Sequence, residues 1–275
     1  MKKSLNFGIV KPTFMIIGVQ KGGTTSLNYY LSQHPQIILP KEKELHYFDT
    51  AAATPTKPYL EMFPKSFFTR KVSYDATPNY IYYPGTAKKI YDFDPKIKFI
   101  VLIRDPVKRA FSAWNMHRQM VTDPLRKEAA RKIQKNDPMI KTYNYFYSNE
   151  FPSFSEWVDF ELGNEFPQGI IEPSIIKRGY YLKQIQEYLK YFPRKNFLFI
   201  DFEIFKMQTL KSLDDITDFL KISHFDKEGL DITPKNKRAY SEKISEEVYK
   251  KLIEHFKMKN KGLEKLTGLK LDWMH

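Results

Sequence analysis

The sequence predicts an α/β fold in which helices flank a central parallel sheet, with a P-loop-like turn at one strand end. Two apolar runs of strand length carry this prediction, Phe14–Ile17 and Phe99–Ile103. Each run leads into a turn and then a helical pattern, and continuously apolar strands are typical of parallel sheets covered on both faces. The 275 residues can form a full core, and no internal repeat or long linker divides them. We therefore expect one domain over residues 1–275, with its core at about 13–273.

The first strand leads into the turn Gly18-Val-Gln-Lys-Gly-Gly-Thr-Thr. A strand, a glycine turn and a helix together aim backbone N–H groups and a helix N-terminus at a phosphate. Gly18 and Gly23 have the spacing of a Walker A motif, but Thr24 stands at its lysine position and the lysine is Lys21. The turn predicts an anion cradle that differs from a nucleotide kinase loop. The alternative is a glycine-rich turn with a solvated lysine.

The second strand ends at Arg104, and Pro106 stands where a helix would begin. Open α/β sheets bind their ligands at the carboxyl ends of the strands, and an arginine fork suits a terminal phosphate. Ser112 follows about two turns into the predicted helix. The alternatives are an ion pair between Arg104 and a helix-capping Asp105, and an idle hydroxyl at Ser112.

A third segment, Lys41–Asp49, combines carboxylates with an imidazole. Interpreted as extended chain, it places Glu42, Glu44 and His46 on one face. A carboxylate and an imidazole near an anion loop form a plausible acid–base pair. The alternative is a solvated charge run.

Together these segments resemble the sulfotransferases that use 3′-phosphoadenosine 5′-phosphosulfate (PAPS), in particular the heparan sulfate 3-O- and N-sulfotransferase branch and its bacterial relatives. Gln20–Ser26 resembles the 5′-phosphosulfate loop, and Glu44-Leu-His-Tyr-Phe-Asp49 resembles a Glu-x-His-Phe-Phe-Asp segment. Ile103-Arg-Asp-Pro-x-x-Arg-Ala-x-Ser112 resembles the 3′-phosphate motif. The sequence departs from the family at Ala76, where the resemblance leads us to expect an active-site lysine.

The resemblance implies a role for each candidate residue. Glu44 is the expected catalytic base, His46 orients it or the acceptor, and Lys21 neutralises the bridging oxygen of the donor. The expected donor contacts come from the glycine turn, the second strand–helix unit and a basic loop: Lys21, Gly22, Gly23, Thr24, Thr25 and Ser26 at the 5′-phosphate, Arg104 and Ser112 at the 3′-phosphate, and Lys237 and Arg238 on the nucleotide. The product would be 3′,5′-adenosine bisphosphate.

Composition limits the partners. The formal net charge is +13, which favours acidic partners. We expect the acceptor to be a glycan or another hydroxyl compound, or an amine, and we expect neither nucleic acid nor a membrane span. There is no cysteine, and the six histidines form no H-E-x-x-H pair, so we expect no metal. Without a leader-like N-terminus, a complete bacterial chain would be cytoplasmic.

Two rival functions stay open at this point. A P-loop kinase-like enzyme would need the Walker lysine that Thr24 replaces, and a noncatalytic polyanion-binding module would not need Glu44. The remaining pattern predicts further elements: a strand that starts at Val72 and ends at the Thr77-Pro78 turn, a strand at 196–200, and helices at 59–63, 154–160, 176–192, 210–220 and 245–266. Residues 116–147 are expected to form helices and a loop over an acceptor cleft.

Overall fold

The computed structural model describes residues 8–50, 56–66, 71–121, 151–163, 174–235, 240 and 242–275. The chain divides into two compact units, which are treated separately below. The first contains residues 1–104, 181–238 and 262–272, and the second contains residues 105–180, 239–261 and 273–275. A single domain over the whole chain stays a prediction.

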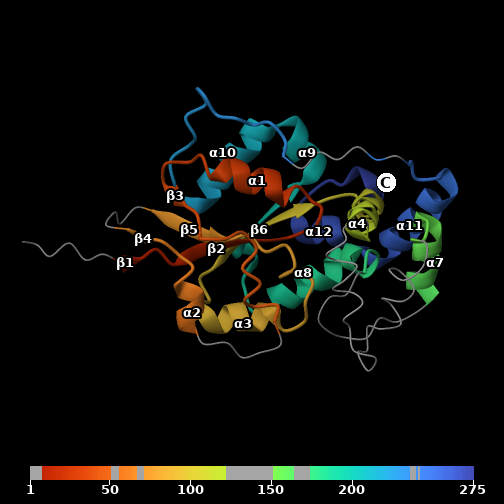
Figure 1. The fold of residues 1–275 in the computed structure, drawn as a ribbon, viewed down its shortest axis with the longest axis horizontal. Helices are drawn as coiled ribbons and strands as arrows, with labels where there is room; N and C mark the ends of the chain where they lie inside the picture. Colours follow the sequence, from red (N-terminus) through yellow and green to blue (C-terminus); the bar gives the residue numbers. More distant parts are fainter. Residues whose placement is uncertain are drawn as a thin grey trace, which may run out of the picture. The chain divides into compact units, whose positions relative to one another are not determined.

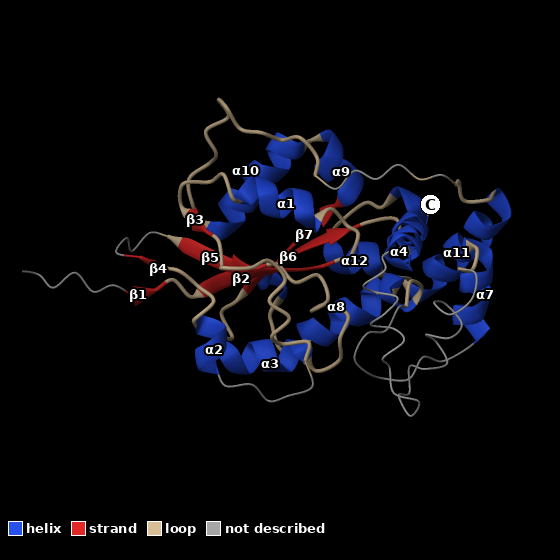
Figure 2. Ribbon diagram, in the orientation of Figure 1, coloured by secondary structure: helices blue, strands red, loops and turns tan. Residues whose placement is uncertain are grey.

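The first unit is built on a parallel five-stranded sheet of order β3-β5-β2-β6-β7 (Figure 2). The strands are β3 (Ile37–Ile38), β5 (Val72–Asp75), β2 (Pro12–Gly18), β6 (Lys98–Ile103) and β7 (Phe197–Asp201). Neighbouring strands all pair in parallel. The two apolar runs form β2 and β6 at the centre of the sheet, which confirms the predicted fold class.

Helices cover both faces of this sheet (Figure 1). One face carries α1 (Thr24–Leu31), α9 (Phe202–Met207) and α10 (Thr209–Leu220), and the other carries α2 (Thr56–Leu60), α3 (Thr86–Phe93) and α8 (Tyr181–Leu189). Alternate residues of each strand point to opposite faces. Phe14 and Ile16 therefore join the core under Leu27 of α1, whereas Phe99 packs edge-on against Tyr188 of α8 at 5.3 Å between ring centroids. The unit also contains β1 (Gly8–Ile9), β4 (Lys65–Ser66), η3 (Arg194–Asn196) and α12 (Leu263–Thr267).

The second unit is helical where the structure describes it. It contains α4 (Pro106–Val121), α7 (Phe154–Gly163), η2 (Lys177–Gly179) and α11 (Glu246–Lys259), and η4 (Asp272–Met274) lies at the end of the chain. The Asp105 carboxylate caps α4 by accepting from the N–H groups of Val107 (2.8 Å) and Lys108 (3.1 Å). This confirms the predicted helix start at Pro106.

Two predicted helices were too long. The helix expected over 245–266 is broken after Lys259, because Gly262 adopts φ of 99° and caps the separate helix α12. The helix expected over 176–192 begins only at Tyr181, after the short 3-10 turn η2. The helix expected at 59–63 lies earlier, as α2.

No helix in the described ranges is both long and apolar enough to cross a membrane. The region expected over the acceptor cleft lies outside the described residues beyond Val121.

Candidate active site

The glycine turn at the carboxyl end of β2 fixes where α1 begins. Gly23 caps the helix with φ of 91°, a conformation that suits glycine because it has no Cβ. A Cβ at Gly23 would also lie only 2.8 Å from the Phe202 ring. The first helical hydrogen bond runs from Leu27 N–H to the Gly23 carbonyl (3.0 Å), so the earlier N–H groups of α1 point out of its N-terminus. The predicted strand, turn and helix are confirmed, and the N-terminus of α1 has the backbone geometry that suits an anion.

One backbone donor of the predicted cradle is already used. The Gly22 N–H donates to the Val19 carbonyl at 2.9 Å, so in this conformation it does not face an anion. The cradle that we propose below therefore begins at Gly23. Within α1, Thr24 is buried and Thr25 is half-buried.

Arg104 lies against the same turn. Its Nη1 donates to the Lys21 carbonyl at 2.7 Å, and its guanidinium lies 4.8 Å from the centroid of the Phe202 ring. Its Nε is buried and has no hydrogen-bond partner among the described residues. The alternative ion pair with Asp105 is not what the structure contains, since Asp105 caps α4. Arg104 thus supports the turn and keeps an unused donor.

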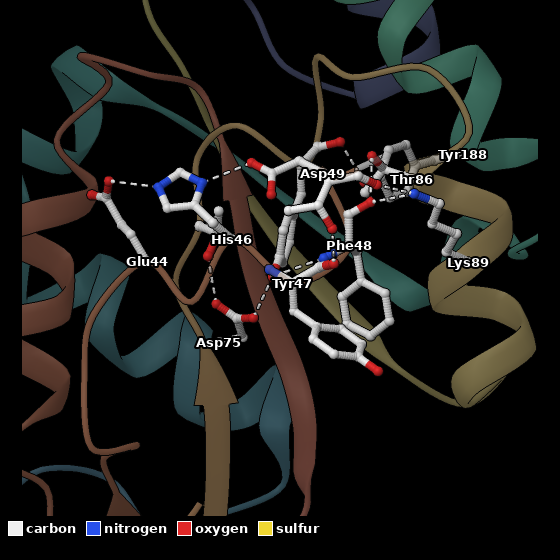
Figure 3. A network of polar contacts seen from close by, with 12 residues as sticks. Glu44, His46, Tyr47, Phe48, Asp49, Asp75, Thr86, Lys89 and Tyr188 are labelled. Carbon is white, nitrogen blue, oxygen red and sulfur yellow. Dashed lines mark hydrogen bonds and ion pairs between the residues drawn. The ribbon is translucent and has the colours of Figure 1, made fainter. Parts of the chain in front are cut away.

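The segment that carries Glu44 is not extended, contrary to the interpretation from sequence. Glu44 and His46 have φ of 61° and 50°, in the left-handed region that side chains rarely adopt. The chain bends at both positions, so strand alternation does not determine which side chains share a face. The two side chains nevertheless meet, with His46 Nε2 3.8 Å from Glu44 Oε2 (Figure 3).

Asp49 holds the opposite side of the imidazole. Its Oδ2 lies 2.8 Å from His46 Nδ1, and its side chain is only 5% exposed (Figure 3). This hydrogen bond raises the pKa of His46 above its ordinary value; partial burial opposes the rise, and the charges of Asp49, Glu44 and Asp75 add to it. We had assigned no role to Asp49, although its position three residues after His46 in the motif could have suggested one.

A buried carboxylate anchors this bent segment to the sheet. Asp75, at the end of β5, accepts hydrogen bonds from Tyr80 Oη (2.7 Å), Thr77 Oγ1 (2.7 Å) and Tyr59 Oη (3.1 Å). Tyr80 Oη in turn accepts from the backbone N–H of Tyr47 at 3.0 Å. Asp75 therefore positions the chain next to His46 through Tyr80, a connection that sequence reasoning missed.

The Asp75 network predicts a pH-dependent stability. Burial raises the pKa of Asp75 to about 6, whereas an aspartate in an unfolded chain titrates near about 3.9. The folded state therefore binds the proton more tightly, and this stability is full below about pH 4 and lost as the pH rises through about 6. We expect Asp75→Asn to remove that loss, so that wild type weakens relative to the variant by about 2 kcal/mol between pH 4 and pH 7.

Urea unfolding at pH 4, 5, 6 and 7 measures this difference. Asp92→Asn, which removes an exposed carboxylate paired with Lys88 on α3, is the control and should track wild type within about 1 kcal/mol. A constant difference in unfolding free energy between wild type and Asp75→Asn across this range would contradict the assignment.

Ser26 joins α1 to the segment that leads to the basic loop. Its Oγ accepts from the Lys235 N–H at 3.0 Å and lies 3.2 Å from the Lys235 carbonyl. Tyr29 Oη donates to Asp231 Oδ2 at 2.8 Å one turn further along the helix. A phosphate bound by the Ser26 hydroxyl, as predicted, would therefore compete with the backbone of Lys235 for that hydroxyl. Lys237 and Arg238 lie outside the described residues.

Ser112 belongs to the second unit. It is buried, and its hydroxyl lies 2.7 Å from that of Tyr240, whose ring packs edge-on against Phe111. Its role at a 3′-phosphate stays a prediction. Within the described ranges, no group of histidine, aspartate and glutamate side chains could hold a metal ion.

The structure thus brings several predicted residues together within the first unit. Arg104 contacts the backbone of Lys21, and Glu44 lies beside His46. Lys43, which sequence reasoning treated as part of a charge run, connects Glu44 to the first turn of α1. Its Nζ lies 3.4 Å from Thr25 Oγ1 and forms an ion pair with Glu44.

Comparison with known proteins identifies the family. The model of the sulfotransferase domain family matches residues 11–265. The membrane-associated sulfotransferase kil1 of Dictyostelium discoideum is 25% identical over 96% of this chain and 67% of its own length. Human heparan sulfate glucosamine 3-O-sulfotransferase 6 is 25% identical over 76% of this chain and 52% of its own length. The mouse bifunctional heparan sulfate N-deacetylase/N-sulfotransferase 4 is 26% identical over 77% of this chain, which spans 22% of that protein.

A solved structure supports the same assignment. The crystal structure of a sulfotransferase from Alicyclobacillus acidocaldarius superposes with a TM-score of 0.70 at 25% identity, covering 97% of this chain and all of the other. The sheet order, the glycine turn and the family match over residues 11–265 agree with one another. The chain therefore belongs to the sulfotransferase domain family and is a sulfotransferase with the P-loop-like fold of that family.

Proposed function

We propose that this sulfotransferase takes its sulfuryl group from PAPS and transfers it to a hydroxyl or amine of a glycan, with Glu44 as the base. The observation that carries the proposal is the connection through Lys43. It places the carboxylate of Glu44 near Thr25, in the first turn of the anion-binding helix. An in-line transfer to an acceptor hydroxyl needs a proton acceptor held close to the phosphate cradle. Here one ammonium group contacts both the candidate base and the first turn of the helix.

The chemistry of the turn suits a phosphosulfate. The N–H groups of residues 23–26 would hold the 5′-phosphate at the positive end of α1. Lys21 would neutralise the oxygen that bridges phosphorus and sulfur as negative charge develops there. Arg104, with its unused buried Nε, would serve the 3′-phosphate. The family resemblance makes Ser112 a second candidate for that phosphate, and Lys237 and Arg238 candidates for contacts to the nucleotide.

Glu44 would accept the proton of the acceptor hydroxyl while the acceptor oxygen bonds to sulfur. The bond between sulfur and the bridging oxygen breaks in the same displacement, and 3′,5′-adenosine bisphosphate leaves with that oxygen. His46, fixed by Asp49, would hold the Glu44 carboxylate toward the acceptor. Such a displacement resembles phosphoryl transfer, in which the protein mainly positions the groups and stabilises charge.

Two observations support a glycan acceptor. Several relatives carry heparan sulfate, a glycan, in their names. The net charge of +13 favours an acidic polymer over a neutral one. Ala76 stands at the position where the resemblance leads us to expect a lysine. We therefore do not expect this chain to share the heparan sulfate specificity of those relatives.

Thermal unfolding tests the donor assignment. We expect 3′,5′-adenosine bisphosphate to raise Tm by several degrees at about 100 times its Kd, where binding stabilises the folded state by about 2.7 kcal/mol. Adenosine 5′-diphosphate, which carries the same two phosphates on one end, is the matched control and should shift Tm much less. A larger shift with ATP or adenosine 5′-diphosphate would favour a kinase-like site and overturn the PAPS assignment.

A further inference from the structure

The proposed function uses Lys43 only as the link between α1 and Glu44 and gives its ammonium no role in the chemistry. Its ammonium lies 3.4 Å from Thr25 Oγ1 on α1 and forms an ion pair with Glu44 Oε1. The side chains of Lys43 and Glu44 are 28% and 38% exposed, so solvent and small ligands can reach the pair. Its position connects the anion-binding helix to the candidate base.

The charges around this ammonium are unevenly distributed. On one side lie Glu44 and, 3.8 Å from that carboxylate, the imidazole of His46, which Asp49 holds. The ammonium also lies near the N-terminus of α1, which carries partial positive charge and no acidic side chain in its first turn. An ammonium has three N–H donors and needs no fixed acceptor geometry, so it can exchange one oxygen for another. A sulfuryl group at the helix end would offer such oxygens within its reach.

We propose that Lys43 binds the sulfuryl oxygens of the donor and, by leaving its ion pair, frees Glu44 to accept the acceptor proton. Before the donor arrives, the carboxylate is occupied by the ammonium. Once the donor is bound, the ammonium stabilises the charge on the transferred group and the carboxylate faces the acceptor. Lys43 thereby makes the base available only when there is a sulfuryl group to transfer. This inference rests on the proposed function.

The ion pair makes a second, opposite prediction for Glu44. Because the carboxylate competes with the donor for the ammonium, its removal should not weaken donor binding. Glu44→Gln is therefore expected to bind PAPS at least as tightly as wild type, whereas loss of the ammonium weakens it. If Lys43 only stabilised the loop, its loss and the loss of the Glu44 carboxylate would not have opposite effects on PAPS binding.

Isothermal titration calorimetry with PAPS and with 3′,5′-adenosine bisphosphate tests the proposal. We expect Lys43→Met to weaken PAPS binding by about 10-fold or more, the scale of one charge-assisted hydrogen bond, and to change 3′,5′-adenosine bisphosphate binding by less than about 2-fold. Lys43→Arg keeps the charge and should recover most of the PAPS affinity. Lys41→Met removes an exposed lysine two residues away and is the control for net charge.

The outcomes separate this inference from the proposed function. If Lys43→Met weakened the binding of both nucleotides equally, or did not weaken the binding of PAPS, the role of Lys43 would be overturned. Binding of both nucleotides by wild type would in that case still support the proposed function. Failure of the wild-type protein to bind either nucleotide would overturn the proposed function and this inference with it. Tighter PAPS binding by Lys43→Met than by Glu44→Gln would also contradict the proposed competition.

Discussion

Replacing Glu44 with glutamine is expected to lower turnover by about 10²- to 10⁴-fold, the usual contribution of a positioned general base. The amide has nearly the shape of the carboxylate but cannot accept the proton of the acceptor hydroxyl. The measurement is release of 3′,5′-adenosine bisphosphate from PAPS in the presence of the acidic glycan that wild type sulfates fastest in a panel of such glycans. Calorimetry on the same variant should show that 3′,5′-adenosine bisphosphate still binds.

The matched control is Glu42→Gln, which removes an exposed carboxylate two residues earlier in the same segment. It should turn over like wild type. If Glu44→Gln kept wild-type turnover, or if both variants lost activity equally, Glu44 would not be the base.

Replacing Lys21 with methionine is expected to lower turnover by about 10²- to 10³-fold, comparable to removing one donor that stabilises developing charge. The lysine lies inside the glycine turn with φ of 66°, and Arg104 holds its carbonyl at 2.7 Å, so the backbone that presents the side chain is fixed by other residues. Methionine keeps the length of the side chain and removes the ammonium. Single-turnover kinetics with PAPS and the same glycan would measure the chemical step directly.

Lys11→Met, an exposed change just before β2, controls for the loss of one charge and should leave the rate unchanged. If Lys21→Met weakened nucleotide binding but left the single-turnover rate at saturation intact, Lys21 would bind the donor without assisting departure of the bisphosphate.

Local sequence patterns predicted the centre of the fold well. The runs that became β2 and β6 are apolar because both faces of a central parallel strand are buried, and that burial needs no knowledge of distant partners. The start of α1 after Gly23 and the start of α4 at Pro106 likewise follow from turn and cap residues next to them in the chain. These features could be predicted because their causes are local.

The arrangement around Glu44 has distant causes, and its geometry was predicted incorrectly. The segment bends at Glu44 and His46 while its backbone is held at Tyr47 by Tyr80, which itself is fixed by the buried Asp75. No periodicity within residues 41–49 indicates that the Tyr47 N–H donates to the hydroxyl of a tyrosine more than thirty residues later. The pairing of Glu44 with His46 was predicted, but the alternation used to argue it does not apply to a bent chain.

A crystal structure of the protein with 3′,5′-adenosine bisphosphate tests the central claim most directly. We predict that the 5′-phosphate lies at the N-terminus of α1, within hydrogen-bond distance of Lys21 and Thr25, and that the Glu44 carboxylate faces the position that the sulfuryl group would take. A 5′-phosphate bound elsewhere, or a Glu44 carboxylate turned away from that position, would contradict the account.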